Sequence, residues 1–289
     1  MHWRFWCGSL LFVLGAMAIA AEGQDPAAAP TANEIVQRSV VNNQADWKAA
    51  PQYAYTETDN ITKHGVTTHR TYRVLMIAGS PYHKLLAINS EPLSAAGAAA
   101  ENRKLQRETH RRQTQGAGAR QARIAKYEQG RRQDHELMQQ MIKGFQYQLL
   151  GIETMDGRQC YAIRATPKPG YRPPNRDTKV LLGMRGELWI DTKAFQWVKV
   201  HAQVFRPVAF GLFIAHVQPG TEFTLEEAPI GGGLWEPVHF RTDVLATILH
   251  FWSRNSTEDD TYRDYKPMNS APVTTASAAR ASNTHEQSD

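Results

Sequence analysis

The chain has 289 residues, of which 42% are hydrophobic and 9% aromatic, so it carries enough apolar material to bury a core. Its formal net charge is +5, from 33 Lys and Arg against 28 Asp and Glu. Two cysteines, Cys7 and Cys160, are too few for a disulfide scaffold. The one apolar run lies at the N-terminus, which excludes a protein with several membrane spans.

Residues 1–21 have the pattern of a cleavable secretory signal. Arg4 gives a short positive region, Phe5–Ala16 is apolar, and the small residues Ala18 and Ala20 precede a cut before Ala21 or shortly after it. A signal anchor retained in the membrane is the alternative, but the apolar run is short for a membrane span. We therefore expect an exported protein that loses Cys7 with its signal.

The segment after the signal is expected to be a flexible leader, residues 22–32, followed by a helix. Asn33 is a candidate helix cap, and Ile35, Val36, Val40 and Val41 recur at helical spacing up to about Ala45. From Pro51 the texture changes to β-prone runs separated by turn formers.

Residues 94–143 form a predicted helical insertion. They contain no proline and are rich in Ala, Gln, Arg and Glu, which favour helices. Gly116 and Gly118 predict a break, and therefore two helices or one frayed long helix. An apolar stripe near the end of the segment, including Leu137, Met141 and Phe145, should pack on the body. The earlier part has few large apolar residues, so we expect it to project into water or to be partly disordered.

The chain from Gly144 reads almost entirely as short strands. Asp156-Gly157 occupies the position of a two-residue hairpin turn. We expect about 11–13 strands, mainly β with helices (α+β), in an antiparallel sheet that curls into a barrel or an incomplete barrel. Residues 267–289 are rich in Ser, Thr and Ala and are expected to be a disordered tail.

The order of these elements resembles that of a known family. The residues that carry the resemblance are Gly157 with Cys160-Tyr161, Pro167-Lys168, Gly186–Asp191, Gly233–Trp235 with Pro237, and Tyr262–Tyr265. Over residues 33–266 the chain resembles the LolA-like superfamily of periplasmic lipoprotein carriers, as a variant with a longer and more basic insertion. The resemblance implies a periplasmic protein with an incomplete β-barrel, in which helices cover an apolar cavity that holds lipoprotein acyl chains or another amphipathic ligand.

Candidate residues for that cavity come from the helical stripe and from aromatic residues on successive strands. In a half-barrel covered by helices these side chains would line a cavity, whereas in a closed small barrel they would fill the core. The candidates are Leu137, Met141, Phe145, Trp189, Trp197, Phe223, Trp235 and Phe240.

The insertion also holds a concentrated positive charge. Residues 101–132 contain ten basic and three acidic side chains, so the rest of the mature chain is negative. We expect this arm to dock on an anionic membrane surface or on an acidic envelope protein, the alternative being a solvated helix without a partner. Nucleic acid is not expected as a partner in that compartment. The candidate residues are Arg103, Lys104, Arg107, Arg111, Arg112, Arg120, Arg123, Arg131 and Arg132.

The sequence contains none of the common catalytic, zinc or nucleotide-binding motifs. We therefore expect no catalytic residue, no metal and no cofactor, with Cys160 as a buried structural thiol. The predicted function is an exported non-enzymatic carrier for lipoprotein acyl chains or another lipid-like ligand. The alternatives are an envelope-stress sensor and, with less support, a hydrolase built on Asp191, His201, His239 and Asp243.

Overall fold

The computed structural model describes residues 29–268, except 176, 211–214 and 249–251. The predicted signal, most of the predicted leader and almost all of the predicted tail lie outside the described residues. The described residues from Thr31 onward belong to one compact unit.

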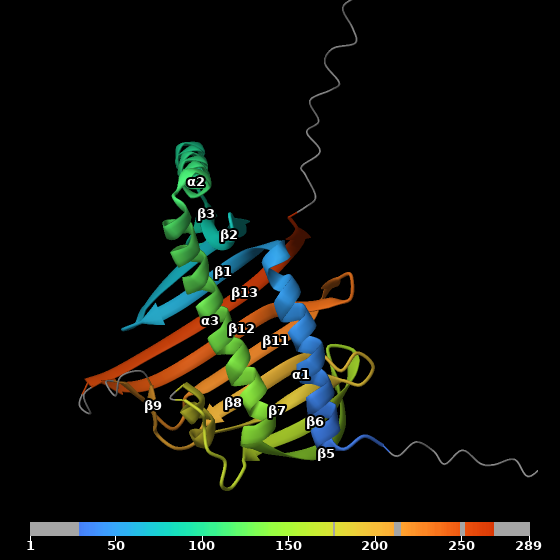
Figure 1. Ribbon diagram of the computed structural model, residues 1–289. Coiled ribbons are helices and arrows are strands. Elements are labelled where there is room, and N and C mark those ends of the chain that lie inside the picture. The colour runs from blue at the N-terminus through green and yellow to red at the C-terminus, as the bar shows by residue number, and fades with distance from the viewer. Residues whose placement is uncertain (1–28, 176, 211–214, 249–251, 269–289) are drawn as a thin grey trace, which may run out of the picture. The chain divides into compact units, whose positions relative to one another are not determined.

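One antiparallel sheet dominates this unit (Figure 1). Its strand order along the main path is β4-β3-β2-β1-β13-β12-β11-β8-β7-β6-β5, with β9 and β10 attached at β12. β4 and β5 lie at the two ends of this order and do not pair with each other, so the sheet stays open. The strands are β1 (Tyr53–Lys63), β2 (Val66–Ile77), β3 (Ser80–Ile88), β4 (Glu91–Pro92), β5 (Phe145–Met155), β6 (Arg158–Pro167), β7 (Met184–Asp191), β8 (Trp197–Val204), β9 (Val208–Phe210), β10 (Ala215–Val217), β11 (Glu222–Gly231), β12 (Leu234–Ile248) and β13 (Trp252–Pro267).

Tight turns set the register of the hairpins. Asp156 and Gly157 have φ values of 48° and 76°, so both central residues of the β5–β6 turn have positive φ. This is the backbone of the type I′ turn that matches the twist of paired strands, and it confirms the predicted hairpin. His64 and Gly65, with φ of 53° and 77°, form the same kind of turn between β1 and β2.

Helix α1 (Ala32–Ala49) begins one residue after its cap, Thr31, rather than at Asn33. The Thr31 hydroxyl accepts a hydrogen bond from the Glu34 backbone, and the Glu34 side chain accepts one from the Thr31 backbone, which makes a capping box. The helix continues past the expected end near Ala45 into the short 3₁₀ helix η1 (Ala50–Gln52).

The apolar face of α1 forms the main core together with the sheet. Ile35, Val36 and Val40 are at most 1% exposed, whereas Val41 is 66% exposed. One residue of this core, Leu181, comes from the 3₁₀ helix η2 (Asp177–Gly183). The buried core residues are Ile35, Val36, Val40, Phe145, Ile163, Ala165, Leu181, Leu188, Ile190, Phe195 and Trp197. A second, smaller cluster consists of Cys160, Val198 and Trp235.

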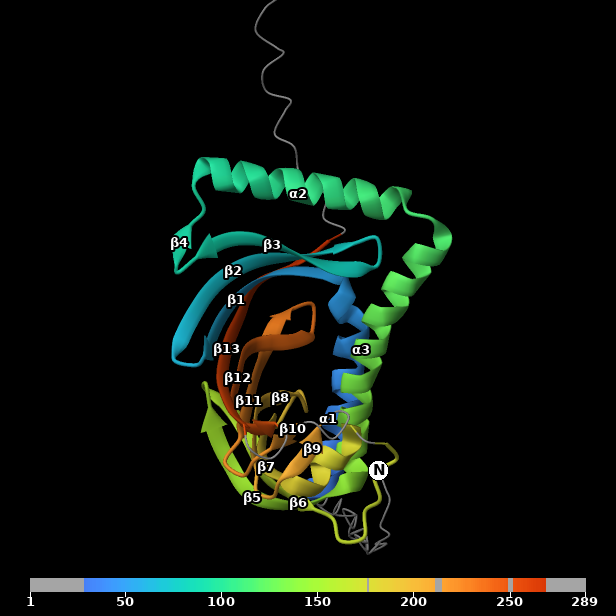
Figure 2. The ribbon, with the colours of Figure 1, turned by 90° about the vertical axis from the view of Figure 1, so that its left-hand side faces the viewer.

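The insertion forms two helices, α2 (Ala95–Thr114) and α3 (Ala117–Gly144), which confirms the break predicted at Gly116. Gln115 has ψ of 145°, an extended conformation that ends α2. Both views show α3 running beside α1 across the inner side of the curved sheet, while α2 crosses over β3 (Figures 1 and 2).

The expectation that the basic part of the insertion projects into water is wrong for three of its arginines. The side chain of Arg112 is 8% exposed and donates to the backbone oxygens of Ile77 and Ser80. Arg123 donates to the Ser80 hydroxyl and to the Ala78 oxygen, at the same turn between β2 and β3. Guanidinium groups offer five donors, which suits them to gather the free carbonyls of a strand turn.

Arg131 fixes the insertion at a second point. Its side chain is 15% exposed, donates to the backbone oxygen of Trp47 and lies over the Trp47 ring at 4.3 Å. His135 stacks on the same ring at 4.5 Å. The insertion is therefore packed against both the sheet and α1, as a helical cover.

Together these elements confirm the predicted fold class, an incomplete antiparallel barrel with helices over one side. Among the described residues, none of the helices combines the length and the hydropathy that crossing a bilayer requires.

Candidate ligand-binding site

A cavity of about 320 Å³ opens between the inner face of the sheet and helix α3. Four strands, η1 and Tyr127 of α3 contribute to its wall, together with the start of β12. The lining residues are Ala50, Pro51, Tyr53, Tyr55, Glu57, Val74, Met76, Pro81, His83, Tyr127, Glu236, Pro237, Tyr262 and Tyr265. Its wall is thus rich in tyrosine rings and carries two carboxylates.

The tyrosine rings pack on one another around this cavity. Tyr55 stacks on Tyr265 with ring centres 5.2 Å apart and meets Tyr262 edge-on at 6.0 Å. The Tyr265 hydroxyl donates to the Pro237 oxygen at 2.6 Å. Burial raises the pKa of Tyr55, Tyr262 and Tyr265, so these phenols stay protonated at physiological pH and present neutral rings.

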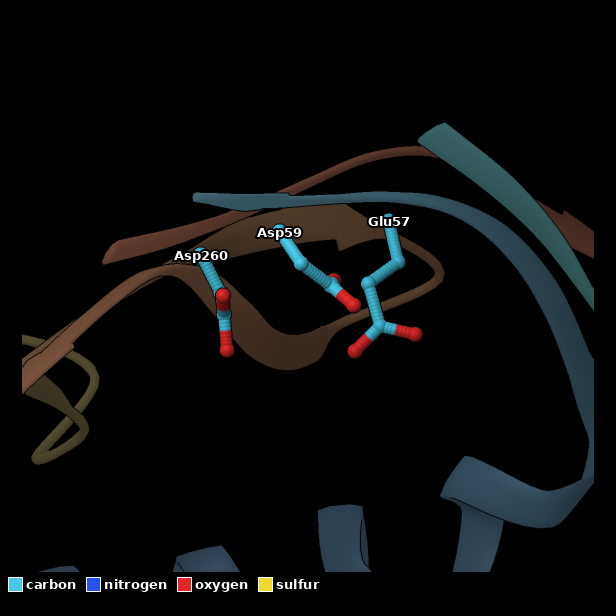
Figure 3. A group of neighbouring side chains, drawn as sticks. All are labelled: Glu57, Asp59 and Asp260. Atoms are coloured by element: carbon cyan, nitrogen blue, oxygen red, sulfur yellow. The ribbon is translucent and has the colours of Figure 1, made fainter. Parts of the chain in front are cut away.

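Three carboxylates, those of Glu57, Asp59 and Asp260, form a group on neighbouring strands (Figure 3). Glu57 and Asp59 alternate on β1, so they share a face, and Asp260 lies directly opposite Asp59 on β13. One oxygen from each of the three lies within 4.8 Å of the others. All three side chains leave the sheet on the side where α1 lies (Figure 3).

These carboxylates repel one another and are poorly hydrated. Burial, followed by the nearby charge of Glu57, raises the pKa of Asp59 to about 6. Burial, followed by the charge of Asp59, raises the pKa of Asp260 to about 7. Asp260 is 5% exposed, and its Oδ1 has no hydrogen-bond partner within the described part of the chain.

His83 is the cationic neighbour of this group. Its Nε2 lies 3.2 Å from Oε2 of Glu57, and its hydrogen bond to Glu57 is the main cause that raises its pKa. Since His83 also lines the cavity, the Glu57–His83 pair forms part of the wall.

Glu236 provides a second carboxylate on the wall, from β12. It is 8% exposed, and its Oε1 lacks a hydrogen-bond partner among the residues that the structure describes. Burial, followed by the charge of Asp46, raises the pKa of Glu236 to about 8, against the opposing effect of Arg131. A buried carboxyl without a partner is costly, so this group would gain from a ligand that pairs with it.

The arrangement can bind cations and hydrogen-bond donors. Carboxylate oxygens are ligands for hard cations and acceptors for N–H donors, and tyrosine faces attract cations. Cys160 and the predicted hydrolase residues do not line this cavity.

The four hydrolase candidates have other partners. Asp191 closes its own turn by accepting from the backbone N–H of Lys193 and Ala194 at 2.8 and 2.7 Å. His201 lies opposite Glu187 on β7, and Asp191 comes four residues after Glu187 on the same strand. Positions four residues apart on a strand are separated by about 13 Å, so His201 and Asp191 are far apart. Asp243 accepts from Arg241, and His239 lies between Glu226 and Asp259.

None of the eight predicted cavity residues lines this cavity. Phe145 and Trp197 are part of the main core, and Leu137 and Met141 pack against it. Trp235 is buried with Cys160, Trp189 packs on that pair, and Phe223 and Phe240 are partly buried on β11 and β12. A role for these eight in holding a ligand stays a prediction.

The predicted basic docking residues divide into two groups. Arg112, Arg123 and Arg131 are engaged with the body as described above, so Arg112 and Arg131 are not free for a partner. The remaining candidates are exposed on α2 and α3: Arg103, Lys104, Arg107, Arg111, Arg120 and Arg132.

The acidic wall is the feature that sequence reasoning missed. The run Tyr53, Tyr55, Glu57, Asp59 alternates with small or hydroxyl residues on β1, so a period of two was visible. It places two tyrosines and two acids on one face, but the sequence does not tell which face of the strand turns inward.

Solved structures similar to this chain include one from the superfamily that the residues resemble. A LolA superfamily protein from Nitrosomonas europaea is 13% identical, with a TM-score of 0.34, over 82% of this chain and 94% of that one. A putative outer membrane lipoprotein-sorting protein domain from Vibrio parahaemolyticus is 9% identical, with a TM-score of 0.34, over 82% and 95%. The MucA/MucB complex of Pseudomonas aeruginosa gives 10% identity and a TM-score of 0.23, over 82% and 98%.

Comparisons with protein-family models and with curated proteins find no match. The open sheet and its helical cover agree with the architecture that the resemblance implies. At these TM-scores the solved structures add nothing on function, which is inferred below from this chain's own side chains.

Proposed function

We propose that the chain is an exported, non-enzymatic binding protein that carries an amphipathic ligand between its curved sheet and its helical cover. The observation that supports this proposal is the cavity with both apolar and acidic walls. Its volume of about 320 Å³ lies at the lower end of the range of small-molecule pockets.

The apolar part of the ligand would be an acyl chain from a lipid or a lipoprotein. Val74, Met76 and the prolines of the wall offer it apolar contact, and each CH₂ group that leaves water contributes about 0.8 kcal/mol. Met76 suits such a surface because an unbranched thioether adapts to ligands of different shape.

The periplasm is the proposed location. The signal-like residues 1–21 support export, and the resemblance to periplasmic carriers supports that compartment. The alternative role as an envelope-stress sensor would use the same cavity, but no contact within the described residues favours it.

Native mass spectrometry of protein purified from a bacterial periplasm tests the binding function. We expect a co-purified lipid, and displacement of an acyl fluorophore by fatty acyl compounds. Met76→Arg would fill the cavity and abolish both, whereas Val66→Arg, 65% exposed on the same strand, would leave them unchanged. Absence of lipid together with absence of fluorophore binding would contradict the proposal.

The exposed basic residues of α2 and α3 are proposed to bring the carrier to an anionic membrane surface or an acidic envelope partner. Each cation near an anionic bilayer contributes about 1 kcal/mol, and the attraction is screened within about 10 Å at 0.1 M salt. Reversing Arg103, Lys104 and Arg107 to Glu should weaken binding to anionic vesicles, whereas Lys63→Glu on β1 should not. Equal binding to neutral and anionic vesicles would refute membrane docking.

A further inference from the structure

The charges around the cavity are unbalanced. Its wall carries Glu57 and Glu236, and Asp59 and Asp260 lie beside Glu57. The neighbouring cations are already engaged within the protein. His83 pairs with Glu57, and Arg131 is bound to Glu128 and Trp47. Arg70 lies opposite Asp59 on β2 and lowers the pKa of Asp59, against the larger effect of burial. An anionic headgroup in this cavity would meet repulsion.

Three of the carboxyls, those of Asp59, Glu236 and Asp260, also have a buried oxygen with no partner among the described residues. Glu236 is 8% exposed and Asp260 is 5% exposed. The Oε1 of Glu236 and the Oδ1 of Asp260 both lack a hydrogen-bond partner among the described residues. Such groups are stabilised when a donor arrives, more strongly when the donor is charged.

The rings around these carboxylates select the kind of donor. Five tyrosines line the cavity, and Tyr55 stands between Tyr262 and Tyr265 in the cluster of packed rings. Ring faces attract an organic cation within about 6 Å of the ring centre. Val74 and Met76 add apolar contact for carbon substituents on the cation, which a bare metal ion does not have.

We propose that the ligand of this cavity carries a positively charged amine on its alkyl or acyl chain, with the amine held by Glu57 and Glu236 and by the tyrosine faces. The proposal rests on the binding function proposed above and narrows its ligand to cationic amphiphiles. A divalent metal ion held by Glu57, Asp59 and Asp260 is the competing outcome.

Proton release on binding is a second signature that the proposal predicts. The pKa of Glu236 is about 8, so the free protein holds much of this carboxyl protonated at neutral pH. A bound amine favours the ionised form, so binding should release protons and tighten as the pH rises from 6 to 8. The titratable and charged groups that act on Glu236 or are influenced by it are Asp46 on α1, Tyr127 and Arg131 on α3, Glu227 on β11, Tyr55 on β1 and Tyr265 on β13.

The test compares three probes with one chain length and different heads: decylammonium, decyl sulfate and decyl maltoside, each below its micelle concentration. Calorimetry on the full mature chain should show the ammonium probe binding at least tenfold more tightly than the other two. Its heat of binding should vary with the ionisation enthalpy of the buffer, which reports proton release. Glu236→Gln should lower the affinity for the ammonium probe about tenfold and leave decyl maltoside unchanged. The matched control Glu187→Gln, on the surface of β7 opposite Arg164, should change neither.

Tyr55→Leu keeps an apolar wall but removes a ring face, so it should also reduce the preference for the ammonium probe. If the three probes bind equally, or the sulfate binds best, the cationic ligand is refuted while the carrier function stands. If none binds and no lipid co-purifies, the carrier function itself fails. If calcium binds and displaces the ammonium probe in a Glu236-independent manner, the site is a metal site and the proposal is overturned.

Discussion

Arg112 of helix α2 donates to both oxygens of Ser80, the backbone oxygen at 2.8 Å and the hydroxyl at 3.0 Å. The same guanidinium reaches the oxygens of Ile77 and Pro81. Together with Arg123, this side chain ties the turn between β2 and β3 to the helical insertion, which the sequence pattern alone places in water.

Replacing Arg112 with Ala should therefore destabilise the fold. The substitution leaves the buried carbonyl of Ser80 and the part-buried carbonyls of Ile77 and Pro81 without this donor, which costs about 1–3 kcal/mol. Urea denaturation measures the change. Arg111→Ala is the matched control, because that neighbour is 62% exposed and its pair with Glu108 lies at the surface, so it should change stability by less than about 1 kcal/mol. Equal effects of the two substitutions would show that the insertion does not dock.

A matched pair of substitutions should show which face of α1 packs on the sheet. Val40→Ala removes two buried methyl groups and should cost about 1.6 kcal/mol or more, from about 0.8 per group and a cavity contribution. Val41→Ala, at a position 66% exposed, should stay within about 0.5 kcal/mol of the original protein. Chemical denaturation of both variants measures the loss of stability. A larger loss for Val41→Ala than for Val40→Ala would show that the other face of α1 packs against the core.

Stability should fall as the pH rises from about 5 to about 8. The folded-state pKa of Glu236 is about 8 against 4.5 when unfolded, and that of Asp260 is about 7 against 3.8. Between these values the folded state binds more protons than the unfolded state, so raising the pH favours unfolding. The raised pKa of His83 acts in the same direction, since its favourable pairing is lost as the histidine deprotonates.

Melting temperatures measured across this range in a ligand-free preparation check the pH effect. Glu236→Gln should flatten the dependence and melt higher than the original chain at pH 8, since an amide has no charge to bury. Glu187→Gln, at the surface, should keep the original slope. A melting temperature that rises steadily with pH would contradict the assignment of these carboxyls as buried.

Cys160 should be unreactive in the folded protein. It is fully buried, and burial raises the pKa of its thiol to about 11, so almost no thiolate is present at neutral pH. A thiol reagent added to the chain from Ala21 onward, which lacks Cys7, should label it only after denaturant is added. Rapid labelling of the native protein would show that the small core cluster around Trp235 opens.

The fold was predictable from the sequence where local chemistry decides the outcome. Asp and Gly, the residues at 156 and 157, readily adopt the positive φ of the turn. Gly116 lies at the break between α2 and α3, and the segments on both sides lack proline and can form helices. The start of α1 was misplaced at Asn33 because both Asn33 and Thr31 can cap a helix. The capping box with Glu34 selects Thr31.

The candidate site was less predictable because it depends on which strands become neighbours. Asp59 and Asp260 are directly opposite each other, yet they come from the first and last long strands, and no spacing in the chain announces that pairing. The aromatic candidates were chosen for hydrophobicity, which equally fits a core, and Trp197 and Phe145 are buried there. Arginine content predicted solvent exposure for the insertion, although an arginine that finds several carbonyls, as Arg112 does, can be buried.

The pairing of β1 with β13 has a consequence for biogenesis. Tyr53 aligns with Pro267, so β1 pairs with β13, the last strand of the chain. β12 lies on the other side of β13. The centre of the sheet therefore cannot assemble until nearly the whole polypeptide has been synthesised, and such distant pairing is slow to form. The junction between the N-terminal strands β1–β4 and the rest of the sheet therefore closes only when the last strand is available, so a chain truncated before β13 would leave one edge of β1 unpaired.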